Sequence, residues 1–358
     1  MKRPGFAWTV AVSLLVWTFA AGGAAAEPRL NRMIELWEQG KPAFGAFARF
    51  RDMDAAIYYA GSDLDFVIFD LEHGATDFTQ FKVFLQFMVD KAQIVKKGNL
   101  QPNVVPLARI PSNGSERNQW AIKQVLDAGA YGLMAPHIAD ADEARFLVAS
   151  SRYTQKVGAA DREPAGERGV SPANAARYWG IPVAEYFDRA DAWPLDPRGE
   201  IAVIAMIESG EGVRNVRTIL SQVKGIAALF IGPHDLSTSL GYSGQPEHPE
   251  TERAIQSVLA AAKEAGVPCG ILVNKGNIEK RVREGFKYLV LSGAPGEIRT
   301  PDPLVRSSVL LGQLPILFNQ SVPGVRCDLQ YRAELRSTES GKNPAVRIET
   351  EIFECQSQ

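Results

Sequence analysis

Two carboxylates and an imidazole stand within four positions of one another in the stretch FVIFDLEHGATD, residues 66–77. The apolar run that begins the stretch is typical of a buried strand, and Asp70, Glu72 and His73 follow where that strand should end. A carboxylate beside an imidazole fixes the tautomer of the ring and raises its basicity, which makes a general base that works near neutral pH. The alternative is a histidine that simply caps a loop.

A second pair of carboxylates, Glu208 and Asp235, lies 27 residues apart, which is about the length of one strand–helix repeat. This spacing predicts that both side chains project from neighbouring strands into the same opening. Two hard oxygen ligands leave coordination positions free for a substrate, an arrangement that Mg²⁺ or Mn²⁺ favours. The alternatives are a helix N-cap at Asp235 and a surface charge at Glu208.

Other polar groups fall at further predicted strand ends. Arg109, in PLARIPS, could donate to a carboxylate or to a developing oxyanion, or else form a salt bridge at the rim. Gly232 and Pro233 form a turn, and the backbone N–H groups beyond it could bind a substrate carboxylate. His137 ends the fourth predicted strand and can line the same opening, whereas the two later histidines are surface or capping groups.

These residues need a scaffold that brings several strand ends together. Apolar, β-branched runs alternate with amphipathic stretches, as in βα units with a parallel sheet. Eight strands are predicted, over residues 42–50, 65–72, 103–110, 132–138, 201–208, 227–232, 268–274 and 288–293. Eight strands with intervening helices in about 250 residues favour a closed (β/α)8 TIM barrel, with catalytic groups at the carboxyl ends of its strands. No G-x-G-x-x-G follows the first strand, which weakens the doubly wound, dinucleotide-binding alternative.

Two segments depart from this repeat. Residues 154–200 form a long connection without a clear period, and we expect it to lie over the active-site face, because long irregular connections are usually functional or mobile. Beyond Gly293, a proline-rich stretch without helical period stands where an eighth helix is expected. The chain therefore divides into a barrel over residues 27–293 and an atypical tail, foreign to the barrel, over residues 294–358.

Composition and the first residues bear on partners and location. The 358 residues are 46% hydrophobic and 22% charged with a formal charge of -2, so nothing global indicates a nucleic-acid partner. Residues 1–26 combine two early basic residues, an apolar run and a small-residue segment, which predicts a cleavable export signal, a periplasmic location and no stable membrane span after cleavage. The alternative is a membrane anchor. The cysteines, Cys269, Cys327 and Cys355, indicate no disulfide framework, although the last two could pair.

The motifs together resemble the HpcH/HpaI-type metal-dependent 2-oxo-acid aldolase and citrate lyase family, which includes 2-dehydro-3-deoxyglucarate and 4-hydroxy-2-oxoheptanedioate aldolases. The resemblance is carried, in family order between Phe44 and Gly293, by FVIFDLEHGATD, PLARIP, IKQVLDAGAYGLMAPHI, GERGVSPANAARYWG, AMIESGEGVRNVRTIL and LFIGPHDLSTSLGY. It implies a phosphoenolpyruvate/pyruvate-domain-like barrel and a homo-oligomer, which in the family is commonly a trimer of dimers.

The resemblance also implies roles for individual residues. Glu208 and Asp235 match the ligands of a divalent ion, Mg²⁺ or Mn²⁺ with Co²⁺ as a further option. His73 matches the catalytic base, Asp70 the acidic residue that supports it, and Arg109 the arginine that stabilises an enolate. The implied reaction is retro-aldol cleavage of a small 4-hydroxy-2-oxo acid to pyruvate and an aldehyde.

One departure from the family leaves the substrate open. Met206 stands two residues before Glu208, where some family aldolases have Gln, so Met206 joins Gly232 and Pro233 as a candidate substrate-binding residue. Carbon–carbon cleavage of an acyl-CoA is therefore an alternative within the same superfamily. A second alternative, drawn from the altered tail, is a truncated remnant without catalytic activity.

Overall fold

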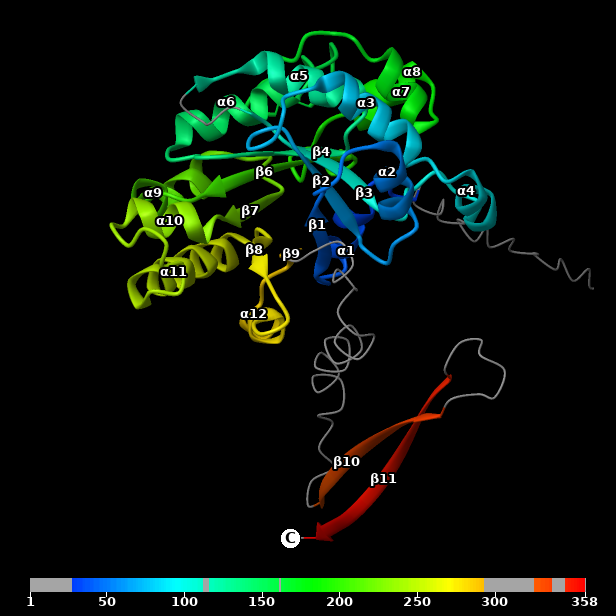
Figure 1. The fold of residues 1–358 in the computed structure, drawn as a ribbon, viewed down its shortest axis with the longest axis vertical. Helices are drawn as coiled ribbons and strands as arrows, with labels where there is room; N and C mark the ends of the chain where they lie inside the picture. The colour runs from blue at the N-terminus through cyan, green and yellow to red at the C-terminus, as the bar shows by residue number, and fades with distance from the viewer. Residues whose placement is uncertain (1–27, 112–115, 161, 293–324, 337–344, 358) are drawn as a thin grey trace, which may run out of the picture.

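Eight parallel strands close into a barrel in the computed structural model, which describes residues 28–111, 116–160, 162–292, 325–336 and 345–357 (Figure 1). The barrel strands are β1 (Ala43–Phe47), β2 (Phe66–Asp70), β3 (Val105–Arg109), β4 (Gly132–Ala135), β6 (Ile201–Ile207), β7 (Ala228–Ile231), β8 (Cys269–Val273) and β9 (Tyr288–Leu291). Pairing of β4 with β6 and of β9 with β1 completes the ring, and the two-residue β5 (Ala192–Trp193) lies beside β6. Each barrel strand falls inside its predicted range, so the predicted (β/α)8 fold is confirmed.

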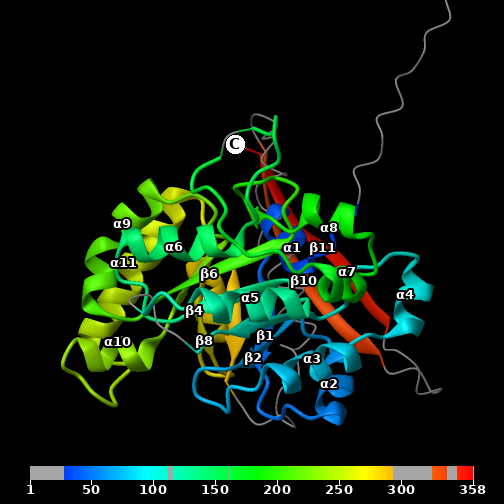
Figure 2. The ribbon, with the colours of Figure 1, turned by 90° about the horizontal axis from the view of Figure 1, so that it is seen from above.

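Helices surround the strands, most of them on the outside of the barrel, while α1 lies across the amino ends of β4, β6 and β9 (Figures 1 and 2). They are α1 (Arg32–Glu38), α2 (Met53–Ala60), α3 (Phe78–Phe87), α4 (Lys91–Lys97), α5 (Gln119–Ala128), α6 (Ala141–Ser151), α7 (Ala173–Trp179), α8 (Val183–Arg189), α9 (Gly210–Gln222), α10 (Pro233–Ser239), α11 (Pro249–Ala265) and α12 (Ile278–Glu284). Several begin at a side chain that accepts an N–H of the first turn, among them Asp52, Asp77, Asp140 and Ser209. These caps fix where each loop from the barrel mouth becomes helix.

The connection over residues 154–200 is partly helical and does not lie where we predicted. Trp179 stacks on Tyr131, just before β4, with ring centroids 4.6 Å apart and planes 4° apart. Glu200 accepts the main-chain N–H of Asn31, which caps α1, at 2.9 Å. These contacts lie at the amino ends of the strands, opposite the mouth. The prediction was wrong because α6 returns the chain from the mouth before this connection begins.

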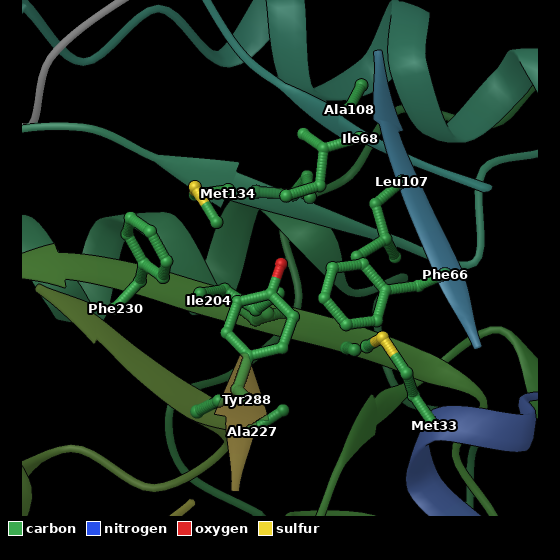
Figure 3. Close-up of a cluster of buried hydrophobic side chains, with 14 of the residues drawn as sticks. Met33, Phe66, Ile68, Leu107, Ala108, Met134, Ile204, Ala227, Phe230 and Tyr288 are labelled. Atoms are coloured by element: carbon green, nitrogen blue, oxygen red, sulfur yellow. The ribbon is translucent and has the colours of Figure 1, made fainter. Parts of the chain in front are cut away.

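Large aromatic and aliphatic side chains fill the inside of the barrel (Figure 3). The rings of Phe66 and Tyr288 approach to 4.6 Å between centroids, among the buried side chains of Ile68, Leu107, Met134, Ile204 and Phe230. A Cβ on Gly45 would lie 2.3 Å from the ring of Phe66, and one on Gly270 would lie 2.4 Å from that of Tyr288. The interior is therefore a close-packed plug, and chemistry is confined to the mouth above it.

The atypical tail contains a feature that the sequence did not predict. β10 (Val325–Arg336) and β11 (Ala345–Ser357) pair antiparallel, and their register makes Cys327 and Cys355 Cα partners. The stretch directly beyond Gly293, where a barrel would have its eighth helix, lies outside the described residues. The predicted signal over residues 1–26 lies outside them too. Among the residues described, no helix is long and apolar enough to cross a membrane.

The close approach of Gly45 to Phe66 leads to a stability prediction. We expect Gly45→Ala to lower the free energy of unfolding by about 1–3 kcal/mol, because the new methyl group would overlap the ring and the main-chain oxygen of Phe66. Urea denaturation measures the change. Gly61→Ala is the matched control, since the nearest atom to its Cβ would be 3.6 Å away. Equal losses in the two variants would contradict this account of the barrel interior.

Candidate active site

A forked ion pair joins the carboxyl ends of β2 and β3. Asp70 and Arg109 are Cα partners in the sheet, and Arg109 donates from Nε to Oδ1 at 2.9 Å and from Nη2 to Oδ2 at 2.7 Å. Arg109 is only 8% exposed. Burial by itself would raise the pKa of Asp70, but the hydrogen bonds and charge of Arg109 outweigh it and hold that pKa below its usual range. The pair is therefore charged and rigid.

Glu72 lies at the junction of the guanidinium and two imidazoles. Its Oε2 is 2.9 Å from Arg109 Nη1 and 3.7 Å from His73 Nε2, and its Oε1 is 3.9 Å from His137 Nε2. The Oε2 atom is buried and the contact with Arg109 lacks the alignment of a hydrogen bond. Burial raises the pKa of Glu72 although the three nearby positive or protonatable groups oppose it. A buried carboxylate oxygen is thus left without a hydrogen-bond donor.

The imidazole of His73 is paired differently from the arrangement that the family resemblance implies. Asp70 Oδ1 accepts the main-chain N–H of Glu72 at 3.1 Å and that of His73 at 3.5 Å, while its side chain is engaged by Arg109. The carboxylate that approaches the His73 ring is that of Glu72. The His73 side chain is 66% exposed, so the ring is accessible from the mouth. Asp70 therefore shapes the loop that carries His73 and does not contact its ring.

Glu208 follows β6, and its side chain is 1% exposed. Its Oε1 accepts the main-chain N–H of His137 at 2.8 Å, and its Oε2 faces Gly232, where a Cβ would lie 2.2 Å from it. The pKa of Glu208 is raised to about 7, chiefly by burial and also by the charges of Asp235 and Glu72, while His137 opposes the shift. Asp235 lies in the first turn of α10 and is exposed. The two predicted metal ligands are thus close enough for the charge of Asp235 to act on Glu208.

The remaining predicted residues line the same region. Gly232 ends the turn after β7 and Pro233 is the first residue of α10. Met206 is 2% exposed and stands two residues before Glu208, so it occupies the same face of β6 one layer deeper. Sequence reasoning missed Arg51, whose Nη1 donates to the main-chain oxygen of Asp70 at 3.0 Å. Its place just beyond β1, at a strand end, was the available signal.

The donor set at this mouth fits a divalent cation. Only glycine at position 232 lets the Oε2 of Glu208 approach the main chain there, since a Cβ would lie 2.2 Å from it, and the buried Oε2 of Glu72 has no hydrogen-bond donor. Within the described ranges, no three His, Cys, Asp or Glu side chains cluster with metal-binding geometry. A cation here would therefore rest on Glu208 and Asp235, with oxygen ligands from water or substrate completing its coordination.

A separate cavity of about 490 Å³ lies away from the mouth, between the end of α3, α4 and α7. Its walls include Met88, Leu100, Arg177 and Tyr178. None of the predicted catalytic or metal-binding residues lines it. The barrel mouth and this cavity are therefore separate features of the molecule.

A closed parallel barrel that gathers carboxylates, a paired arginine and imidazoles at the carboxyl ends of its strands defines a TIM-barrel enzyme. The sequence profile of the HpcH/HpaI aldolase/citrate lyase family matches residues 44–296. The chain belongs to this family and is a carbon–carbon lyase.

Individual relatives agree with this assignment. The chain is 32% identical over 247 residues to the 4-hydroxy-2-oxo-heptane-1,7-dioate aldolase of Shigella sonnei, covering 68% of this chain and 81% of that one. It superposes with a TM-score of 0.61 on a family protein from Burkholderia cenocepacia, at 28% identity over 79% of this chain and 98% of the other. The family aldolase of Desulfitobacterium hafniense gives a TM-score of 0.58 at 27% identity, over 78% and 96% of the two chains.

The Asp70–Arg109 pair leads to a prediction about stability and pH. Asp70→Asn should lower the free energy of unfolding at pH 7 by about 1–3 kcal/mol, because it leaves the buried guanidinium with one charged partner fewer. Since the folded-state pKa of Asp70 is lowered from 3.8, the advantage of the wild type is present above pH 3.8 and is lost as the pH falls below it. Urea denaturation between pH 7 and 3 measures this difference.

Glu264→Gln provides the control, because it removes an exposed pair with Arg217 at 3.0 Å. It should leave the free energy of unfolding almost unchanged at every pH, because an ion pair in water contributes little to stability. A wild-type advantage over Asp70→Asn that persists unchanged at pH 3 would contradict the assignment of a lowered pKa to Asp70.

Proposed function

We propose that the protein is a divalent-metal-dependent aldolase that cleaves a 4-hydroxy-2-oxo acid to pyruvate and an aldehyde. The observation that carries the proposal is the buried carboxylate of Glu208, whose Oε2 lies against Gly232 and whose pKa is raised by burial and, in part, by the charge of Asp235. The name of the Shigella sonnei relative, a 4-hydroxy-2-oxo-heptane-1,7-dioate aldolase, supports the class of substrate.

Glu208 and Asp235 are the residues that would hold the cation, Mg²⁺ or Mn²⁺, with Co²⁺ as a further option. When bound, the cation supplies positive charge that attracts the 2-oxo acid and offsets negative charge on its carbonyl oxygen. Gly232 makes room for the carboxylate of Glu208 itself, and the N–H groups that follow Pro233 in the first turn of α10 would receive the substrate carboxylate. The side chain of Met206 makes the base of the mouth apolar at this point.

His73 is the proposed base. Its exposed ring, close to the carboxylate of Glu72, takes the proton of the C4 hydroxyl, directly or through one water molecule. The electron pair of that O–H bond forms the aldehyde carbonyl as the C3–C4 bond breaks, and the pair from the C3–C4 bond forms the enolate of pyruvate. The enolate carbon then takes up a proton, which completes pyruvate and balances the reaction.

Arg109 is the proposed stabiliser of the enolate. A guanidinium carries five N–H donors, and three nitrogen contacts of Arg109 are directed to Asp70 and Glu72. Within the described part of the chain, Arg109 hydrogen-bonds only to Asp70, through one N–H of Nη2 and that of Nε, so N–H groups on both terminal nitrogens would be able to donate to an oxygen in the mouth. Because the ion pair with Asp70 fixes the plane of the guanidinium, these donors need no reorganisation as negative charge develops.

The reaction and its metal requirement are tested by the release of pyruvate from 4-hydroxy-2-oxo acids. We expect turnover with Mg²⁺ or Mn²⁺ and its loss on addition of a chelator, with recovery when the metal is restored. Glu208→Gln and Asp235→Asn should each lower kcat/KM by about 100-fold or more, because each removes a charged ligand. The rate is measured with a coupled enzymatic assay for pyruvate.

Glu211→Gln is the matched control, since Glu211 is an exposed carboxylate in the first turn of α9, three residues beyond Glu208. It should retain the wild-type rate. Cleavage that persists unchanged in the presence of a chelator would refute metal dependence. Acyl-CoA cleavage without pyruvate release would favour the alternative lyase reaction.

The proposal extends to an exported homo-oligomer, a hexamer as in the family. The N-terminal sequence pattern supports export. Exposed apolar side chains on neighbouring helices α2 and α3 support association, because such patches mark protein contacts; they include Met53, Ile57, Tyr58, Val83 and Phe87.

Both points can be tested on protein released from the periplasm of an expressing bacterium. We expect mass spectrometry to give the mass of a chain that begins at Glu27. We expect light scattering to give a molar mass several times that of this chain. Retention of residues 1–26 in a membrane fraction would contradict export. A monomer at micromolar concentration would contradict the proposed assembly.

A further inference from the structure

His137 holds a backbone conformation that L residues rarely adopt. It stands two residues beyond β4 with φ at 55°, and Arg117, with φ at 52°, is the other non-glycine residue with positive φ in the described part of the chain. The left-handed region brings Cβ close to the following carbonyl oxygen, so glycine visits it readily and other residues do so rarely, with asparagine, aspartate and histidine the most frequent among them. A histidine held there indicates that its main chain meets a specific demand.

Two main-chain hydrogen bonds hold the turn at His137, and one of them goes to Glu208. The main-chain N–H of His137 donates to Glu208 Oε1 at 2.8 Å, and the next N–H, of Ile138, donates to the main-chain oxygen of Met206 at 3.0 Å. The turn is thus tied to β6 on both sides of its most strained residue. With Oε1 held in this way, Oε2 is the atom that faces Gly232.

We propose that His137 is a positioning residue that acts through its main chain. Its left-handed conformation aims one N–H at Glu208, holds Oε1 as a hydrogen-bond acceptor and leaves Oε2 for a divalent cation. The inference rests on the proposed function, because the cation is the one that the aldolase reaction requires.

The imidazole of His137 is not the group that carries this role. Its Nδ1 lies 3.4 Å from the same Oε1 that the main chain already engages, and its Nε2 is 3.9 Å from Glu72 Oε1. Neither ring nitrogen makes a hydrogen bond to Glu208, and the ring contributes to no cluster of three metal-binding side chains among the described residues. The main chain and the ring therefore make different predictions for substitutions.

Binding of Mn²⁺ alone, measured by calorimetry on the mature chain, distinguishes a role of the His137 main chain from a role of its ring. His137→Gly and His137→Asn remove the ring but tolerate positive φ, so both should bind Mn²⁺ with a Kd within about twofold of the wild type. His137→Val disfavours the left-handed region, and its Kd should rise about tenfold. His137→Ala, with an intermediate tolerance, should fall between them and serves if the valine variant does not fold.

Arg117→Val is the control, because it places valine at another position with positive φ. The side chain of Arg117 lies over the ring of Phe146 and not at Glu208. It should lower the melting temperature and leave the Kd for Mn²⁺ unchanged. Equal weakening in the glycine, asparagine and valine variants would assign the role to the ring and overturn the inference, as would unchanged affinity in the valine and alanine variants. A wild-type protein that binds no Mn²⁺ would instead refute the proposed metal site, and this inference with it.

Discussion

The barrel mouth depends on the ion pairing of the Arg109 guanidinium with Asp70 and Glu72. The guanidinium joins β2 to β3 through both oxygens of Asp70, reaches Glu72 at 2.9 Å and lies 4.6 Å over the ring of Phe47 at the end of β1. Removing such a charge from water costs several kcal/mol unless it is paired with good geometry. The pairing therefore holds three consecutive strand ends in one arrangement, and the proposed acid–base groups are attached to those ends.

The packed interior sets the height and direction of these side chains. Phe66, Ile68 and Asp70 share one face of β2, so the residues that anchor the strand inside the barrel also decide that Asp70 points into the mouth. A slip of one residue would turn all of them outward. Because Gly45 and Gly270 make room for the rings of Phe66 and Tyr288, the plug is filled from a few large side chains and the register is strongly defined.

The parts of the structure that could be predicted from the sequence are those that depend on local pattern. Apolar runs located the eight strands, and polar residues at their ends, such as Arg109 and Glu208, located the mouth. The position of residues 154–200 could not be predicted, because it depends on how α6 returns to the amino end of the barrel. The φ of His137 and the central place of Glu72 were missed for a similar reason, since both are set by contacts between residues that lie far apart in the chain.

The charges at the mouth are divided unevenly, and the division indicates where each part of the chemistry belongs. On the β2 side Arg109 lowers the pKa of Asp70, although burial raises that of Glu72, whereas on the β6 and β7 side burial and neighbouring carboxylates raise the pKa of Glu208. A carboxylate buried beside further negative charge is unfavourable unless a proton or a cation joins it. A cation at Glu208 and Asp235 would relieve that cost, and it would leave the donors of Arg109 and the ring of His73 facing the substrate from the opposite side.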